Sequence, residues 1–158
     1  MGLLNGIVYL GFASHGDIGP YHGWLLGYNA TNLTLVSSFN STPNGGLGGF
    51  WQGGGGLAAD VVGNFYVMTG NGSFNATTGI ISPTNSFGMA VLKFTTTNTP
   101  PKLVDYFSPY DQAFQSDADW DLGSGGAVVL PDSAGSANHP HLLPVAGKKR
   151  NNLFVGPG

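Results

Sequence analysis

Short runs of alternating hydrophobic and polar residues recur along the chain, separated by segments rich in Gly, Asn and Pro. Alternation over a few residues, bounded by turn-forming residues, predicts β-strands. No stretch predicts a helix. We therefore expect an all-β protein, with strands in residues 6–12, 24–28, 33–39, 55–60, 64–69, 87–94, 103–107, 125–131 and 141–146.

Several of these patterns occur twice along the chain. The separation, about 60–70 residues, is a long form of the period of β-propeller blades. A blade has four antiparallel strands, and small residues in its innermost strand let neighbouring blades approach. The paired patterns are residues 54–60 with 124–132, 5–11 with 63–70, and 35–39 with 103–107.

Specific strings between the strands carry a family resemblance. Over residues 5–147 the chain resembles the quinoprotein-like (PQQ-like repeat) β-propeller family of bacterial proteins. The resemblance implies a propeller of four-stranded antiparallel blades, and it leaves activity open because the family includes both dehydrogenases and scaffolds. The strings are Ser-His-Gly-Asp (14–17), Pro-Tyr-His-Gly-Trp (20–24), Ser-Thr-Pro-Asn-Gly-Gly (41–46), Trp-Gln-Gly-Gly-Gly (51–55), Tyr-Val-Met-Thr-Gly-Asn-Gly (66–72) and Asp-Leu-Gly-Ser-Gly-Gly (121–126).

The expected strands divide one partial propeller domain, residues 1–158, into three blades. We letter the strands of a blade A to D from the channel outward. Residues 1–39 supply strands B to D of the first blade, and residues 54–108 form a complete blade. Residues 125–158 supply strands A and B of the third blade, with a remnant of strand C at 153–155. This is too few for a ring of at least four blades. We expect closure as a homo-oligomer, a dimer or trimer in which C-terminal strands of one copy complete the N-terminal blade of the next. The alternative is a fragment that folds only within a longer parent.

The composition of the chain limits the kinds of partner that it can bind. Charged residues make up 8% of the chain, and five Lys and Arg without a basic stripe disfavour nucleic acid. No apolar run approaches the ~18 residues of a membrane helix, and no signal peptide leads the chain, so a soluble protein is expected. Its location stays open, including a secreted or periplasmic parent. The chain has no cysteine, which excludes disulfides and a thiol nucleophile.

Ionisable side chains gather in loops that strand alternation places at one end of the channel. His15, Asp17 and His22 lie in the loop between the B and C strands of the first blade, and Asp119 and Asp121 precede a later inner strand. Imidazole and carboxylate groups are ligands for a divalent metal such as zinc or calcium, and a metal would activate water. Without metal, a histidine beside an aspartate could act as a general base. The alternative for each is a turn-stabilising hydrogen bond.

Aromatic and amide side chains lie in the same loops. Trp51, Gln52 and Trp120 precede glycine-rich strands, where they could line a funnel for a small-molecule substrate. Packing between blades is the competing interpretation for the two tryptophans. His139 and His141 fall on a turn that belongs to the opposite end, so we interpret them as structural.

Two functions therefore stay open. The first is a metal-dependent hydrolase of small esters or phosphoesters, with His15, Asp17 and His22 as catalytic groups and His15, Asp17, Asp119 and Asp121 as metal ligands. The second is a non-catalytic binding or scaffolding propeller module. The resemblance also suggests a remnant of a PQQ-dependent dehydrogenase. This third possibility is disfavoured because the chain has no vicinal cysteines and too few blades to enclose PQQ.

Overall fold

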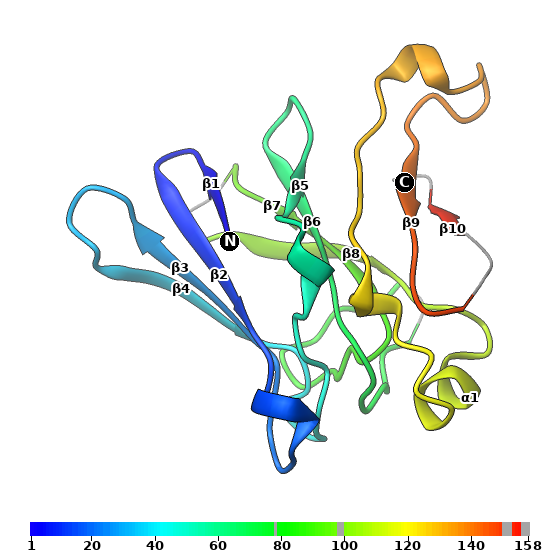
Figure 1. Cartoon of the computed structure of the whole chain (residues 1–158). Helices are drawn as coiled ribbons and strands as arrows, with labels where there is room; N and C mark the ends of the chain where they lie inside the picture. Colours follow the sequence, from blue (N-terminus) through cyan, green and yellow to red (C-terminus); the bar gives the residue numbers. More distant parts are fainter. Residues whose placement is uncertain (78, 98–99, 150–152, 156–158) are drawn as a thin grey trace.

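Three antiparallel sheets stand side by side in the computed structural model, which describes residues 1–77, 79–97, 100–149 and the backbone of 153–155 (Figure 1). The all-β prediction is confirmed. The sheets are formed in chain order by β1 (Gly2–Leu4), β2 (Ile7–Phe12), β3 (Trp24–Asn29) and β4 (Leu35–Asn40); by β5 (Ala58–Ala59), β6 (Asn64–Met68), β7 (Val91–Thr95) and β8 (Lys102–Phe107); and by β9 (Leu143–Val145) with β10 (Leu153–Val155).

The first sheet has four strands, whereas residues 1–39 were expected to supply three. The additional strand is β1, which pairs with β2 through Leu3 opposite Val8. Asn5 and Gly6 connect the two strands with φ values of 49° and 74°. Asn-Gly is the preferred pair for a tight hairpin whose central residues both have positive φ. The first and second sheets are therefore both continuous four-stranded meanders.

Two other expectations were wrong. A short helix, α1 (Gln112–Asp117), occupies a segment without a predicted element. At six residues it is too short to show a helical repeat. Residues 125–131 do not form a regular strand, although Ala127 bridges to Val145 and Val128 donates a backbone hydrogen bond to Pro144. Because Pro144 has no N–H, it cannot return a bond, and the ladder stays incomplete.

Apolar side chains fill both interfaces of the second sheet. Toward the first sheet, the ring of Phe65 lies 4.6 Å from Tyr9 and stacks on Phe94 at 5.0 Å. Toward the third sheet, Met68 and Val91 pack against a separate cluster. The remaining buried members of that cluster are Tyr66, Met89, Leu122, Leu143 and Val145. The second sheet is thus covered on both faces.

Glycine crowding is greater in the loops than in the predicted inner strand. A Cβ on Gly55 or Gly56 would lie 3.2 Å from its nearest atom, a backbone oxygen, whereas one on Gly123 would lie 2.7 Å from the backbone of Thr69 and Gly70. The small residues therefore permit close approach chiefly where loops of successive sheets meet. Within the described part of the chain, no helix is long and apolar enough to cross a bilayer.

Candidate functional site at the loop end

Three long connections meet at one end of the molecule, the lower end in Figure 1. They are residues 13–23, with the short turn η1 (His15–Asp17); residues 70–86; and residues 108–124, with α1. The sequence predicted that these connections share one end. The carboxylate cluster is defined here as the residues at this end that contact or electrostatically influence one another. From these connections it comprises Asp17, Tyr21, Asn71, Asp119 and Asp121, and from neighbouring segments Trp51 and Lys148.

Lys148 joins the two carboxylates that were expected to bind metal. Its Nζ lies 3.0 Å from Asp119 Oδ2 and 3.1 Å from Asp121 Oδ2. Burial alone would lower the pKa of Lys148, but the hydrogen bonds and charges of both aspartates outweigh burial and raise it. The ammonium group therefore stays charged, and a metal at this position would have to displace it.

Asn71 contacts the same two carboxylates from the second sheet. Its backbone N–H donates to Asp121 Oδ1 at 2.9 Å, and its Nδ2 donates to Asp119 Oδ1 at 2.8 Å. The pKa of Asp119 is lowered, first by the hydrogen bond from Lys148 and then by that from Asn71. Asp121 is 8% exposed, and its two side-chain oxygens are both engaged. These bonds connect the loop after β6 to residues 119–121.

Close backbone approach makes these bonds possible. A Cβ on Gly70 would lie 2.6 Å from Asp121 Oδ1 and 2.7 Å from the Trp51 ring. Any larger residue at position 70 would push both side chains away from Asn71. The absence of a side chain at Gly70 therefore determines how closely Asp121 and Trp51 approach the second sheet.

Tyr21 adds a phenol to the carboxylate cluster. Its hydroxyl donates to Asp17 Oδ1 at 2.5 Å, and its ring meets the Trp51 ring edge-on at 6.3 Å. Burial raises the pKa of Tyr21 first, followed by the hydrogen bond to Asp17 and the charges of Asp17, Asp121 and Asp119. Tyr21 consequently remains a neutral hydrogen-bond donor, and three carboxylates contribute to the negative potential around it.

The two histidines do not join Asp17. His15 is exposed on η1, while the Nδ1 of His22 lies 2.9 Å from the Thr42 carbonyl oxygen and 3.2 Å from Thr42 Oγ1. His22 is thus engaged with the next loop. His141 pairs with Asp132 at 2.9 Å, at the opposite end of the molecule, where the sequence placed it.

The predicted funnel residues also have partners within the chain. With its amide oriented to satisfy both groups, Gln52 donates to the Gly56 carbonyl at 3.0 Å and accepts from the Met68 N–H at 3.2 Å. Trp120 is 38% exposed; Phe114 packs edge-on against its ring, and Lys149 Nζ lies 5.8 Å from the ring centre. Gln52 contacts the second sheet, and Trp120 packs against α1.

Sequence reasoning did not select Tyr21, Lys148 or Lys149. A charge signal for the lysines was present, because four of the eight aspartates lie in residues 111–121 and three of the five Lys and Arg lie in 148–150. Lys149 Nζ contacts Asp111 Oδ2 at 2.6 Å, in parallel with the contacts of Lys148. The pKa of Asp111 is lowered, chiefly by the hydrogen bond from Lys149, despite the opposing effect of burial.

Among the described residues, the carboxylate cluster contains one buried hydrogen-bond acceptor without a partner. Within the described residues, no group of three or more His, Cys, Asp or Glu is arranged to hold a metal ion. The Oδ1 atom of Asn71 is buried and lacks a hydrogen-bond partner among those residues, so it could accept one bond from a ligand.

Comparison with known proteins gives no relative from which a role could be transferred. No family model matches the chain, and no curated protein is detectably similar to it.

Proposed function

We propose that this chain is a self-associating, non-catalytic binding module built from propeller-type blades. The observation that carries the proposal is the uncovered apolar face of the first sheet. This outer face, directed away from the second sheet, includes Leu3, Val8, Leu10, Phe12, Trp24, Leu26 and Tyr28, and at its β4 edge Leu35 with the polar Ser38 and Asn40.

Strand register places these side chains together. Val8 is opposite Tyr28, Leu10 opposite Leu26 and Phe12 opposite Trp24, so each pair lies on one face. The alternate residues Ile7, Tyr9 and Leu25 are buried against the second sheet. The outer face includes three large side chains with considerable exposure: Leu3 at 67%, Phe12 at 46% and Trp24 at 41%.

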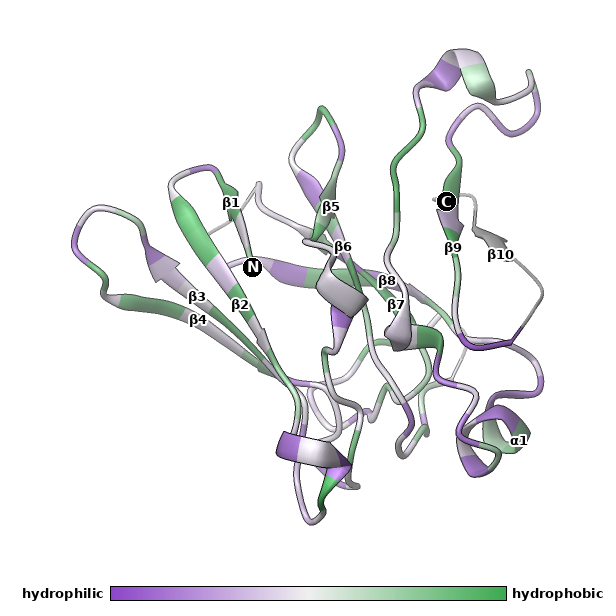
Figure 2. Ribbon diagram, in the orientation of Figure 1, coloured by the Kyte–Doolittle hydropathy of each residue, from purple (hydrophilic) through white to green (hydrophobic). Residues whose placement is uncertain are grey.

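The outer face also lacks charge. Strands β1 to β4 contain no Asp, Glu, Lys, Arg or His, and Figure 2 shows hydrophobic residues along β2 and β4. Contiguous exposed apolar surface on a protein indicates an interaction site. An uncharged patch favours an equally apolar protein surface over nucleic acid or an anionic lipid headgroup.

A second copy can offer such a surface. Beside the third sheet, in the segment that bridges to β9, Ala127 and Val129 pack toward the second sheet, while Val128, between them, is 57% exposed. Stacking this side on the outer face of another copy would repeat the sheet-on-sheet packing already present within one chain. The contact is head to tail, and it gives a closed ring if the rotation between copies closes. Two copies would supply four four-stranded sheets and two two-stranded ones, and closed propellers have four to eight blades.

Because β1 already provides a fourth strand, the contact proposed here is between sheet faces, not the completion of a blade by donated strands. Light scattering coupled to size-exclusion chromatography tests it. The wild-type chain, of 16.3 kDa, should elute as a multiple of that mass. Phe12→Lys should yield a folded monomer, because burying an unpaired ammonium at the contact is unfavourable.

Phe114→Lys provides the matched control, since Phe114 is 60% exposed on α1, away from the outer face. This variant should assemble as the wild type does. A wild-type chain that is folded and monomeric at tens of micromolar would overturn the proposal, as would an assembly that Phe12→Lys leaves intact. Circular dichroism of each variant separates loss of assembly from loss of folding.

A metal-dependent hydrolase at the loop end is the second candidate. The observation that favours it is the negative potential from Asp17, Asp119 and Asp121 around Tyr21. Lys148 competes with a cation there, so Lys148→Met should increase affinity for a divalent ion. Zinc and calcium titrations, with ester and phosphoester hydrolysis measured before and after chelation, test this candidate. Chelator-sensitive turnover that Asp17→Asn or Asp121→Asn abolishes would favour it over a binding role.

A further inference from the structure

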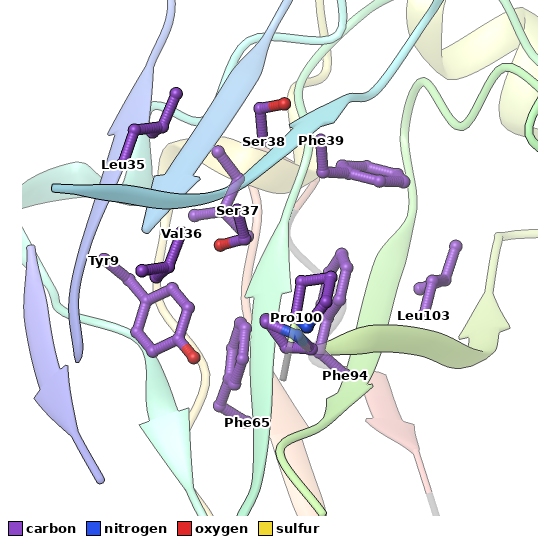
Figure 3. A pocket seen from close by; sticks show the side chains of 12 residues that line it. Tyr9, Leu35, Val36, Ser37, Ser38, Phe39, Phe65, Phe94, Pro100 and Leu103 are labelled. Carbon is purple, nitrogen blue, oxygen red and sulfur yellow. The ribbon is translucent and has the colours of Figure 1, made fainter. Parts of the chain in front are cut away.

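A pocket of about 390 Å³ lies between the first and second sheets, away from the carboxylate cluster. Figure 3 shows side chains from both sheets at its border, including Tyr9 from β2, Val36 from β4, Phe65 from β6 and Phe94 from β7. Pockets that bind small molecules typically have volumes of about 300–1,000 Å³ and are mostly apolar, with a few polar groups that orient the ligand. This pocket has the corresponding size and lining.

One polar atom in the pocket lining lacks a partner. Tyr9 is 1% exposed, and its hydroxyl has no hydrogen-bond partner among the described residues. Figure 3 shows the hydroxyl oxygen on the side of the Tyr9 ring that is next to Phe65. A buried hydroxyl without a partner is unfavourable by about 1–3 kcal/mol, so a ligand that supplies an acceptor would remove that penalty.

We infer that this pocket binds a small uncharged molecule with an aromatic or alicyclic body and a carbonyl or ether oxygen, which accepts a hydrogen bond from Tyr9. None of the described residues that line the pocket is charged, so neither a carboxylate nor an ammonium group would be neutralised by them. An apolar cavity of about 150 Å³ can hold benzene, so roughly two fused rings fit the available volume.

The protonation state of Tyr9 agrees with this ligand class. Burial raises the pKa of Tyr9, and the hydroxyl therefore stays protonated at neutral pH. Ser37 and Ser38 also line the pocket and provide further hydroxyl groups. Tyr9 is nevertheless the group that distinguishes ligands, because its hydroxyl lies in the apolar interior.

The test uses two neutral bicyclic probes that differ in one group: 1-tetralone, which has a carbonyl, and tetralin, which does not. Each is titrated into the full chain and followed by NMR chemical shifts. The wild type should bind 1-tetralone more tightly, and Tyr9→Phe should weaken that binding about threefold to tenfold while leaving tetralin unaffected. Tyr106→Phe is the matched control, because Tyr106 has a second buried, unpartnered hydroxyl and does not line the pocket.

A pair of larger substitutions tests the location independently of Tyr9. Val36→Phe should fill the pocket and weaken both probes at least tenfold, whereas Val104→Phe, on the exposed side of β8, should leave both affinities unchanged. The inference is overturned if neither probe binds the wild type, if Tyr9→Phe and Tyr106→Phe have equal effects on 1-tetralone, or if Val36→Phe leaves binding intact.

Discussion

The first and second sheets have the same strand order and different surroundings. Each is a four-stranded antiparallel meander with a bulge between its third and fourth strands. The second sheet is covered on both faces and has charged residues at Lys93, Lys102 and Asp105, whereas the first is covered on one face and has no charged strand residue. One topology thus serves as the centre of the molecule in one case and as an apolar boundary in the other. Residue choice on a single face accounts for that difference.

The largest effect should come from removing an aromatic ring at the centre of the interface between these sheets. Phe65 is fully buried between Tyr9 and Phe94, so Phe65→Ala should reduce the free energy of unfolding by about 3–5 kcal/mol. Phe12→Ala, on the outer face, should change it by less than about 1 kcal/mol under monomeric conditions. Urea denaturation measures both values. Equal losses would mean that the outer face is already packed within one copy.

An intermediate effect is expected at the loop end, where Asp121 and Asp17 differ in burial and in their number of hydrogen-bond partners. Asp121 is buried and bonds to both Asn71 and Lys148, so Asp121→Asn should be destabilising by about 1–3 kcal/mol. Asp17, after the first sheet's β2, is exposed and, among the described residues, accepts a side-chain hydrogen bond from Tyr21 alone, so Asp17→Asn should be destabilising by at most about 1 kcal/mol. Thermal unfolding at one pH ranks the two variants, and the reverse order would contradict the described geometry.

A smaller effect is expected on how stability depends on pH, and it should differ between the first hairpin turns of the two sheets. Burial would raise the pKa of Asp60, but hydrogen bonds from Asn64, Tyr66 and Val62 outweigh burial and lower it. A lowered pKa stabilises the fold above the unfolded value of about 3.9, and that contribution is lost as the pH falls through the folded value. The free energy of unfolding should therefore decrease less between pH 6 and pH 3 in Asp60→Asn than in the wild type.

The corresponding turn of the first sheet provides the control for this pH effect. Asn5 has φ 49° and carries no charge, so Asn5→Ala should destabilise equally at both pH values. If Asp60→Asn and the wild type lose the same free energy of unfolding between pH 6 and pH 3, Asp60 contributes no pH-dependent stability. The two turns would then not differ in their response to pH.

Local patterns were sufficient to predict most strands and the shared end of the long loops. Alternation identified β2, β3 and β6, but the three-residue β1 is too short to alternate, and only the Asn5-Gly6 pair could have indicated it. The six-residue α1 is similarly shorter than two helical turns. Strands of five residues or more therefore carry strong local signals, whereas the three-residue β1 and the six-residue helix α1 carry weak ones.

The contacts of the candidate site could be predicted only in part. Loop topology placed Asp119 and Asp121 near the loop that carries Asn71, but the approach of Lys148 depends on how the chain after β9 passes beside Asp121, whose backbone carbonyl accepts from the Lys148 N–H. The position of Tyr9 at the pocket could not be inferred either, because alternation identifies Tyr9 as a core residue without indicating whether its hydroxyl has a partner. The metal and hydrolase interpretations of His15, Asp17 and His22 stay predictions.

The uncharged strands of the first sheet have a thermodynamic consequence. An interface formed through the outer face would contain no ion pair from this side, so added sodium chloride should screen nothing there. Burial of apolar surface lowers the heat capacity on association, and such association weakens on cooling. Assembly should consequently strengthen from 5 °C to 25 °C and in sulfate, and an assembly driven by surface charge would not follow this pattern.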